Sequence, residues 1–356
     1  EDMGLLKKGH LVAWEQIDLV NYNTLKKISM DNFHPDSLMN FSNFESFDNN
    51  DSIIKIVGND FEISFSKKEG TLKSWKKNGV ELLLNGPKPN FWRIPTDNDF
   101  GNNMPKRMAS WKEASDIQII EKVDAVKQSG LAKVKVYYKY ANVKSLGEIE
   151  YNIFGNGHII VRHNFRPYDD DLPNIPRIGI SMEIPKNFDN IVWYGRGPHE
   201  NYCDRKSSTM VDVYSGKVSE QFHHYIRPQE SGNKTDVRWA TFRNKSGVGL
   251  MFSGFFSFNA NHYRSDDFDH GFDSYVGSQT ENFNVIKKQM HTTNLIERDL
   301  VHVSIDHLQM GVGGEDSWGA QPLAQYQIIP KEYTHYFKMI PLEENSDPKI
   351  EAKDHF

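Results

Sequence analysis

The stretch Ala132–Val143 reads AKVKVYYKYANV, and its apolar side chains recur at every second position between lysines. Successive side chains of a strand point to opposite faces, so this period is typical of a strand with one buried and one solvated side. Gly147–Phe154, which reads GEIEYNIF, shows a similar alternation. Both runs therefore predict half-buried strands of an antiparallel sheet.

Much of the remaining chain has the same character. Runs rich in β-branched and aromatic residues are bounded by Gly, Asn, Asp and Pro, which is typical of strands and turns. They include SIIKIVG (Ser52–Gly58), FEISFSKK (Phe61–Lys68), HIIVRHNF (His158–Phe165), RIGISMEI (Arg177–Ile184) and NIVWYG (Asn190–Gly195). Helical signals are few: Met104–Ala114 predicts a short helix and Lys26–Phe33 a weaker one. The expected fold is mostly β, built from long antiparallel sheets.

The N-terminal region has a different pattern. His10–Leu19 predicts a strand, whereas Asn21–Asp51 is polar and rich in Asn, Ser and Asp, as linkers are. A lone strand leaves both backbone edges unpaired, so we expect residues 1–20 to belong to a unit upstream. We then expect a linker over 21–50, the main domain over 51–345 and a C-terminal tail over 346–356.

Composition excludes several classes of function. The 356 residues carry a net charge of −6, which argues against nucleic-acid binding, because phosphate contacts need a basic surface. No stretch is long and apolar enough to predict a membrane span. The single cysteine, Cys203, excludes an internal disulfide and leaves the cellular compartment open. The sequence contains no nucleophile elbow, phosphate-binding loop, dinucleotide fingerprint or zinc-protease motif.

Phe91–Trp111 gathers aromatics, an arginine and the triplet Asp97-Asn98-Asp99. Such a triplet is suited to ligating a cation, capping a turn or bonding a sugar hydroxyl, and capping is the commonest of these roles. Gly101 and the two asparagines that follow make a natural hinge.

Two further stretches concentrate charge. In Trp193–Arg205 the residues His199, Glu200, Asp204 and Arg205 lie next to aromatics, which indicates either a paired structural network or a site. His223 and His224 are adjacent, so on a strand they point apart and a metal site there is not favoured.

Asp266–Asp273 reads DDFDHGFD and resembles half a calcium loop. It lacks the Gly and terminal Glu spacing of an EF-hand, so a solvated acidic loop is the favoured interpretation.

Gly313–Trp318, GGEDSW, places a large indole on a glycine-rich loop. Glycine permits backbone angles that other residues resist, so little can pack the tryptophan in place. An indole displayed in this way suits a lid, a stacking platform or a plug.

Five stretches together resemble the C-terminal part of the β-galactosidases of glycoside hydrolase family 2, in that family's order. They are Gly9–Gln16, Phe91–Gly101, Trp193–Arg205, Ser219–Trp239 and Gln309–Pro322. The resemblance covers nearly the whole chain and is weakest over Tyr22–Asn50 and Asp266–Thr293. It implies a large antiparallel β-supersandwich like that of galactose mutarotase. Residues 1–20 would be the last strand of an upstream immunoglobulin-like domain.

The resemblance also implies a function. The whole protein would hydrolyse terminal β-D-galactosides such as lactose with retention, which needs two carboxyl groups roughly 5–5.5 Å apart. In that family both catalytic glutamates, and the magnesium and sodium ligands, lie on a TIM barrel upstream, so no catalytic residue and no metal ligand is expected in this chain. A homo-oligomer is expected for the full-length protein.

By the same resemblance, Trp318 stacks on the sugar at the mouth of the active site. Asp97, Asn98, Asp99 and Gly101 would border that mouth on a mobile loop, with Gly101 as its hinge. The chain departs from the family at Cys203, where proline is expected, and at Ser231, where asparagine is usual.

Three alternatives stay open. One is a separate small subunit of a two-chain β-galactosidase, with the barrel on another polypeptide, although the lone N-terminal strand weighs against it. A stand-alone aldose epimerase of the same fold class would need a His and a Glu facing one sugar, and the adjacent His199 and Glu200 would point apart on a strand. A non-catalytic carbohydrate-binding module is the third.

Overall fold

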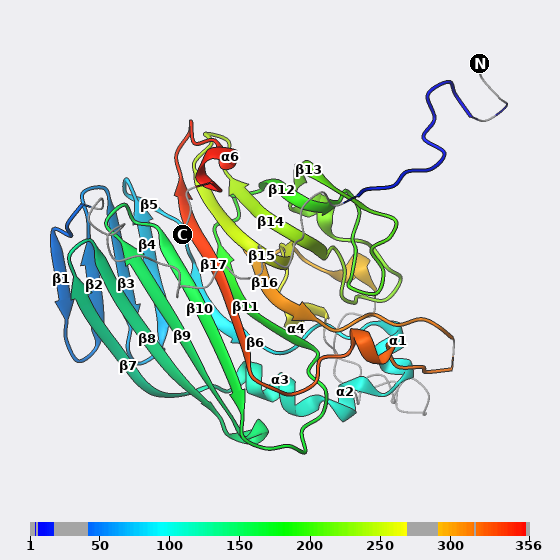
Figure 1. The fold of residues 1–356 in the computed structure, drawn as a ribbon, viewed down its shortest axis with the longest axis horizontal. Helices are drawn as coiled ribbons and strands as arrows, with labels where there is room; N and C mark the ends of the chain where they lie inside the picture. The colour runs from blue at the N-terminus through cyan, green and yellow to red at the C-terminus, as the bar shows by residue number, and fades with distance from the viewer. Residues whose placement is uncertain (1–3, 5, 18–41, 269–290, 317, 354–356) are drawn as a thin grey trace.

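The computed structural model describes residues 4, 6–17, 42–268, 291–316 and 318–353. Within these residues the chain forms two antiparallel sheets, with the short helices α1 (Asp97–Gly101), α2 (Met104–Arg107) and α3 (Ala109–Asp116) at one end and α6 (Pro348–Glu351) at the other (Figure 1). The smaller sheet has the order β1-β2-β3-β4-β5. Its strands are β1 (Ser46–Asn49), β2 (Ile53–Val57), β3 (Phe61–Ser66), β4 (Thr71–Lys77) and β5 (Val80–Glu81). The prediction of a mostly β, antiparallel fold is confirmed.

The larger sheet has 12 strands and runs in the order β13-β12-β14-β15-β17-β10-β9-β8-β7, while β16 joins β15 to β11, and β11 pairs with β6. The bounds are β6 (Asn85–Asn90), β7 (Ile119–Gln128), β8 (Leu131–Tyr140), β9 (Ser145–Phe154), β10 (Ile159–Pro167), β11 (Arg177–Ile184), β12 (Asn190–Gly197), β13 (Met210–Lys217), β14 (Lys234–Arg243), β15 (Gly249–Asn261), β16 (Val301–Gln309) and β17 (Tyr333–Leu342).

The alternation in Ala132–Val143 is realised in β8. Val134, Val136, Tyr138 and Tyr140 are buried, whereas the intervening side chains on the other face are half-buried. The Tyr138 hydroxyl donates to the Gly70 carbonyl at 2.7 Å, so this face packs beneath the smaller sheet. Each fully buried aliphatic side chain contributes about 1.5–3 kcal/mol, which makes this face a main part of the core.

The predicted helix at Met104–Ala114 is present but interrupted. It forms α2 (Met104–Arg107) and α3 (Ala109–Asp116), with α1 (Asp97–Gly101) just before them. Met108 ends α2 with non-helical backbone angles, φ −116° and ψ 14°. It lies buried with Trp111 in the core, so these helices pack on the sheets through a small apolar face.

The expected domain boundaries need correction at both ends. The predicted linker over 21–50 includes β1, which pairs with β2, and Phe44, which is buried against Phe61. The predicted tail over 346–356 includes α6 (Pro348–Glu351), and the Ser346 carbonyl accepts a 2.6 Å hydrogen bond from Arg243. Both segments are polar overall, so the sequence pattern did not predict the few contacts that join them to the domain. The predicted weak helix at Lys26–Phe33 lies outside the described residues.

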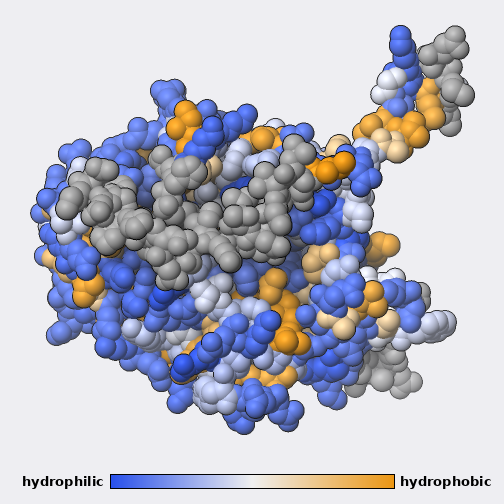
Figure 2. All heavy atoms as spheres, in the orientation of Figure 1, coloured by the Kyte–Doolittle hydropathy of each residue, from blue (hydrophilic) through white to orange (hydrophobic). Residues whose placement is uncertain are grey.

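The predicted strand at His10–Leu19 is not formed over residues 10–17, which the structure describes. A strand requires the backbone of a neighbouring strand, whereas the described part of this segment contacts edge strand β13 through the Gln16 side chain, which exchanges two hydrogen bonds with the Val211 backbone at 2.8 Å each. The segment projects from the body (Figure 1), and Figure 2 shows apolar residues on its surface. Leu11, Val12, Trp14 and Ile17 are all exposed.

In the described part of the chain, the helices are too short or too polar to cross a membrane.

Candidate functional site

The Trp318 side chain is 91% exposed, which confirms the exposure expected for it. Its loop begins where β16 ends and continues past Pro322, running over the same end of the molecule as α1 (Figure 1). The indole therefore contributes little to the core of this chain, and its large apolar surface is available to a ligand or another domain.

The start of this loop is held firmly. The wholly buried Arg93 guanidinium donates to the carbonyl of Met310 and, at 2.9 Å, to that of Gly311. The Asp204 carboxylate accepts a 2.9 Å hydrogen bond from the Gly313 amide. The backbone thus enters the loop from a fixed position.

The tip of the loop is shaped by Asp316. Its Oδ1 accepts from the amides of Trp318 at 2.9 Å and Ala320 at 3.1 Å. These backbone hydrogen bonds lower the pKa of Asp316 below its ordinary value. Gly319 follows with φ +92°, and a Cβ there would lie 2.4 Å from the Gly101 carbonyl oxygen, so only glycine fits.

Within the triplet Asp97-Asn98-Asp99, Asp99 takes the capping role. Thr96 is the N-cap of α1, and its side chain and that of Asp99 form a reciprocal capping box. Asp99 also accepts from Arg93 at 2.8 and 3.2 Å, and both side chains are wholly buried. Burial lowers the pKa of Arg93, but the charge and hydrogen bond of Asp99 outweigh burial and raise it overall.

This arrangement corrects one expectation. Asp99 was expected at the rim of the site, yet its carboxylate is buried in an ion pair and does not face solvent. Asp97 is exposed and accepts a 2.9 Å hydrogen bond from Gln229. Asn98 donates to the Val312 carbonyl at 3.0 Å. The structure therefore brings Asn98 and Gly101 against the Trp318 loop, whereas Asp99 supports them from below.

The cluster in Trp193–Arg205 is a paired structural network. Glu200 accepts from Arg205 at 2.5 Å, from the Gly232 amide at 2.7 Å and from the Tyr225 hydroxyl. His199 contacts Ser208 at 3.0 Å on the surface. Asp204 of the same stretch supports the start of the Trp318 loop.

Cys203, the departure from the expected proline, lies within a closed turn. The backbone groups of Tyr202 and Arg205 exchange hydrogen bonds at 3.1 and 2.9 Å, so this turn is held without proline. Burial, with a further effect of Asp204, raises the pKa of the Cys203 thiol to about 11. The thiol therefore stays protonated and poorly reactive at neutral pH.

The described residues of the other candidate clusters make structural contacts. His223 and His224 are both exposed, and the His223 ring packs on Tyr225 with centroids 4.3 Å apart. Asp267 in the acidic stretch pairs with Arg298 at 2.7 Å, which makes it a structural ion pair, while residues 269–273 of that stretch lie outside the described residues. Among described residues, no group of three or more His, Cys, Asp or Glu has the geometry of a metal site.

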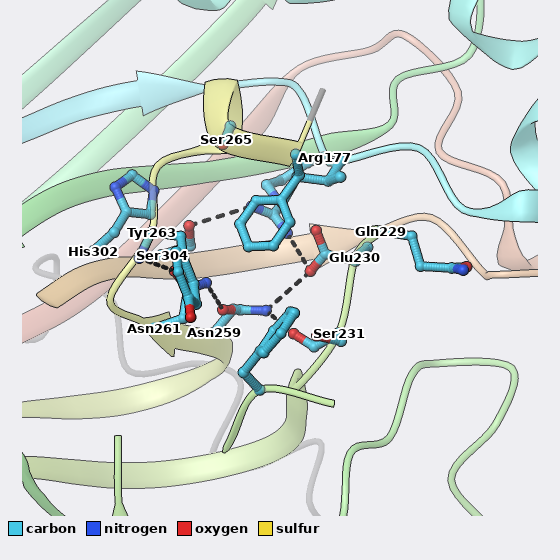
Figure 3. Close-up of a pocket in the computed structure, with 13 residues that line it drawn as sticks. Arg177, Gln229, Glu230, Ser231, Asn259, Asn261, Tyr263, Ser265, His302 and Ser304 are labelled. Carbon is cyan, nitrogen blue, oxygen red and sulfur yellow. Dashed lines mark hydrogen bonds and ion pairs between the residues drawn. The ribbon is translucent and has the colours of Figure 1, made fainter. Parts of the chain in front are cut away.

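The sequence did not predict a largely polar pocket, shown in Figure 3, whose lining also includes the aromatic side chains of Phe222, Tyr263 and Phe268. Arg177 lies at its base, paired with Glu230 at 3.1 Å and with the buried Asp306 at 3.3 Å. Burial raises the pKa of Asp306 to about 7, and Arg177 only partly opposes this. Isolated polar residues in otherwise apolar strands, such as Ser304 and Asp306 in β16, are the sequence feature that could have indicated this buried polar cluster.

The free space in this pocket is about 10 Å³, which is room for about one water molecule. His302 and Glu230 both line the pocket, but a sugar ring has no space between them. The pocket is therefore a buried polar network of the core in this conformation, and not an open catalytic groove.

Comparison with known proteins shows the family to which the chain is similar. A family model described as beta galactosidase small chain matches residues 57–339. A β-galactosidase of Priestia megaterium is 34% identical over 296 residues, 83% of this chain and 27% of the relative. A β-galactosidase of Pseudoalteromonas haloplanktis is 28% identical over 347 residues, 94% of this chain and 30% of the relative. The chain thus spans less than a third of the length of these two relatives.

Among solved structures, a galactose mutarotase related enzyme from Lactobacillus acidophilus is 8% identical, with a TM-score of 0.43 over 81% of this chain and 96% of that chain. The family model covers well over half of this chain, in a single match that runs from the end of β2 into β17. The chain belongs to the β-galactosidase small-chain family.

Proposed function

We propose that this chain is the C-terminal part of a β-galactosidase that hydrolyses terminal β-D-galactosides with retention. Within the whole protein the chain supplies the rim of the active site and a stacking surface for sugar, and the catalytic carboxylates come from upstream. The observation that carries the proposal is the 91% exposed Trp318 on a loop whose start is fixed.

The chemistry of an indole supports this role. A sugar ring presents C–H groups on its faces, and these pack well on a large flat aromatic surface. A flexible loop would lose much of that interaction to ordering on binding, whereas a loop fixed at its start loses less. The exposed apolar residues Leu11, Val12, Trp14 and Ile17 support a second part of the proposal, that an upstream domain packs against this N-terminal segment.

The alternatives are less well supported. An aldose epimerase needs a His and a Glu facing a sugar, and the pocket that holds His302 and Glu230 has only about 10 Å³ of free space. A separate small subunit of a two-chain enzyme would use Trp318 in the same way, with the barrel on another polypeptide. In either arrangement we propose that magnesium and sodium bind to the barrel and not to this chain.

The test is a comparison of the isolated chain with a protein that also contains the upstream domains, assayed on a chromogenic β-galactoside. We expect turnover only by the longer protein, because this chain contributes no catalytic carboxylate. The first-formed product anomer, followed by NMR, should be β. Turnover by the isolated chain, after contaminating enzyme has been excluded, would overturn the proposal, as would α-anomer formation or catalysed anomer interconversion by the isolated chain.

A further inference from the structure

The Trp318 loop touches the rest of the chain through α1. The Asn98 side-chain amide donates to the Val312 carbonyl at 3.0 Å, across 214 positions of sequence. The same amide nitrogen lies 3.0 Å from where a Cβ of Gly314 would stand, so it fills the space beneath that residue. After Trp318 in the sequence, Gly319 packs against the Gly101 carbonyl. The loop therefore meets α1 on both sides of Trp318.

The α1 turn is itself held by several contacts with its surroundings. Its first turn is held by the Thr96–Asp99 capping box and by the buried Arg93–Asp99 ion pair. Its end is held by the buried Phe100 ring, whose centroid lies 3.6 Å from the Arg227 guanidinium carbon. Asn98 thus projects from a fixed turn, and its hydrogen bond to the Val312 carbonyl holds the loop against that turn.

The exposed indole has little packing of its own to orient it. The hydrogen bonds of Asp316 to the Trp318 and Ala320 amides set the local turn, but they do not tie the turn to the rest of the domain. The orientation of Trp318 relative to the domain therefore depends on the fixed loop start, on Asn98 and on the Gly101–Gly319 contact.

We propose that Asn98 is a positioning residue that holds the Trp318 loop on α1 in the orientation that binds sugar. This inference rests on the proposed role of Trp318. Without the Asn98 amide the loop samples more orientations, and the indole must be ordered each time substrate binds. The loss falls on substrate binding, because Asn98 acts through Trp318 and does not touch the reacting bond.

The experiment is a double-mutant cycle in the full-length enzyme with Asn98→Ala, Trp318→Ala and both together, measured as KM and kcat on a β-galactoside. We expect Asn98→Ala to raise KM about threefold to tenfold with kcat nearly unchanged, the size expected for one lost hydrogen bond. In the Trp318→Ala background the same change should have no further effect, because coupled residues are not additive.

Two further variants make the cycle specific. Asn98→Asp keeps the shape of the side chain but removes the donor, so it should raise KM at least as much as alanine does. Asn142→Ala is the matched control, since Asn142 also donates a side-chain amide to a backbone carbonyl, that of Ser110 at 2.9 Å, away from the Trp318 loop. It should leave KM unchanged.

The outcomes separate the two proposals. If Trp318→Ala leaves KM unchanged, the stacking role and this inference both fail. If Trp318→Ala raises KM but Asn98→Ala does not, or if the two effects multiply in the double variant, the stacking role stands and the positioning role of Asn98 is overturned.

Discussion

Asp99 is a buried residue that holds α1 in place, whereas its expected position was at the rim of the site. It accepts two hydrogen bonds from Arg93, at 2.8 and 3.2 Å, and a third from the Thr96 amide at 3.0 Å. Arg93 in turn holds the carbonyls of Met310 and Gly311. One buried ion pair therefore joins α1 to the segment that leads to Trp318.

We predict that Asp99→Ala lowers the free energy of unfolding by about 3–5 kcal/mol, because it leaves the Arg93 charge buried without its carboxylate. Chemical denaturation of the isolated chain measures this directly. Glu69→Ala is the control, since it breaks an exposed pair with Lys73 whose side chains are 48% and 55% exposed and should cost less than about 1 kcal/mol. Equal free energies of unfolding for the two variants would show that the buried Arg93–Asp99 ion pair stabilises the fold no more than the exposed pair does.

At the scale of elements, the start of the folded domain depends on β1. This strand pairs with β2 across Ser46–Val57 to Asn49–Ile54, and Phe44 just before it is buried with its ring 6.3 Å from that of Phe61. A Cβ on Gly155 would lie 1.8 Å from the Ser42 carbonyl oxygen, so the chain already packs closely on the domain at residue 42.

We predict that a chain starting at residue 42 keeps nearly the melting temperature of the whole chain, whereas one starting at residue 51 melts well below it. The second truncation removes β1 and the buried Phe44 side chain, whose loss alone costs about 3–5 kcal/mol. Phe44→Ala in the longer version should reproduce most of the drop. If both truncations melt together, residues 42–50 are a linker after all.

At the scale of the whole molecule, four histidines oppose protonation: His163 and His335 are buried, and His158 and His302 are half-buried. Burial lowers the pKa of His158 and His163 to about 3 and that of His302 to about 4, and it lowers the pKa of His335 well below 6.5. The unfolded chain takes up these protons near pH 6.5 and the folded chain does not. Stability is therefore lost as pH falls below about 6.5, by about 1.4 kcal/mol per pH unit for each histidine.

Asp306 changes the free energy of unfolding with pH in the opposite direction to the histidines. Its folded pKa of about 7 lies above the ordinary 3.8, so its contribution to stability is present at low pH and is lost as pH rises towards 7. We predict that the free energy of unfolding falls between pH 6.5 and pH 5, with a slope below that of four histidines alone. Denaturant titrations at several pH values measure this slope.

His335→Leu should reduce the slope of the free energy of unfolding against pH by about 1.4 kcal/mol per pH unit, the effect of one proton. The reason is that both ring nitrogens of His335 are buried without a hydrogen-bond partner among the described residues. His223→Leu, at an exposed position, should leave the slope unchanged. An unchanged slope in His335→Leu would mean that this histidine is protonated in the folded state.

Sequence patterns predicted what depends on neighbouring residues. The alternation in β8 and β9 follows from a period of two along one strand, and the exposure of Trp318 follows from the glycines around it. The role of Asp99 depends on Arg93 and on carbonyls more than 200 positions away, which no local pattern records. The ion pairs of Arg177 with Glu230 and with Asp306 likewise join three distant segments. The sequence therefore left the choice between cap, cation site and sugar ligand open at the triplet.

The most direct test of the account is Trp318→Ala in the full-length enzyme, with KM and melting temperature measured on the same preparation. Loss of a stacking surface should cost about 1–3 kcal/mol of sugar binding, a rise in KM of about 5- to 150-fold. The melting temperature should hardly change, because the indole is 91% exposed within this chain. Tyr168→Ala, an exposed aromatic on another loop, should alter neither quantity. A large fall in melting temperature with an unchanged KM would contradict the account and assign Trp318 to packing between domains.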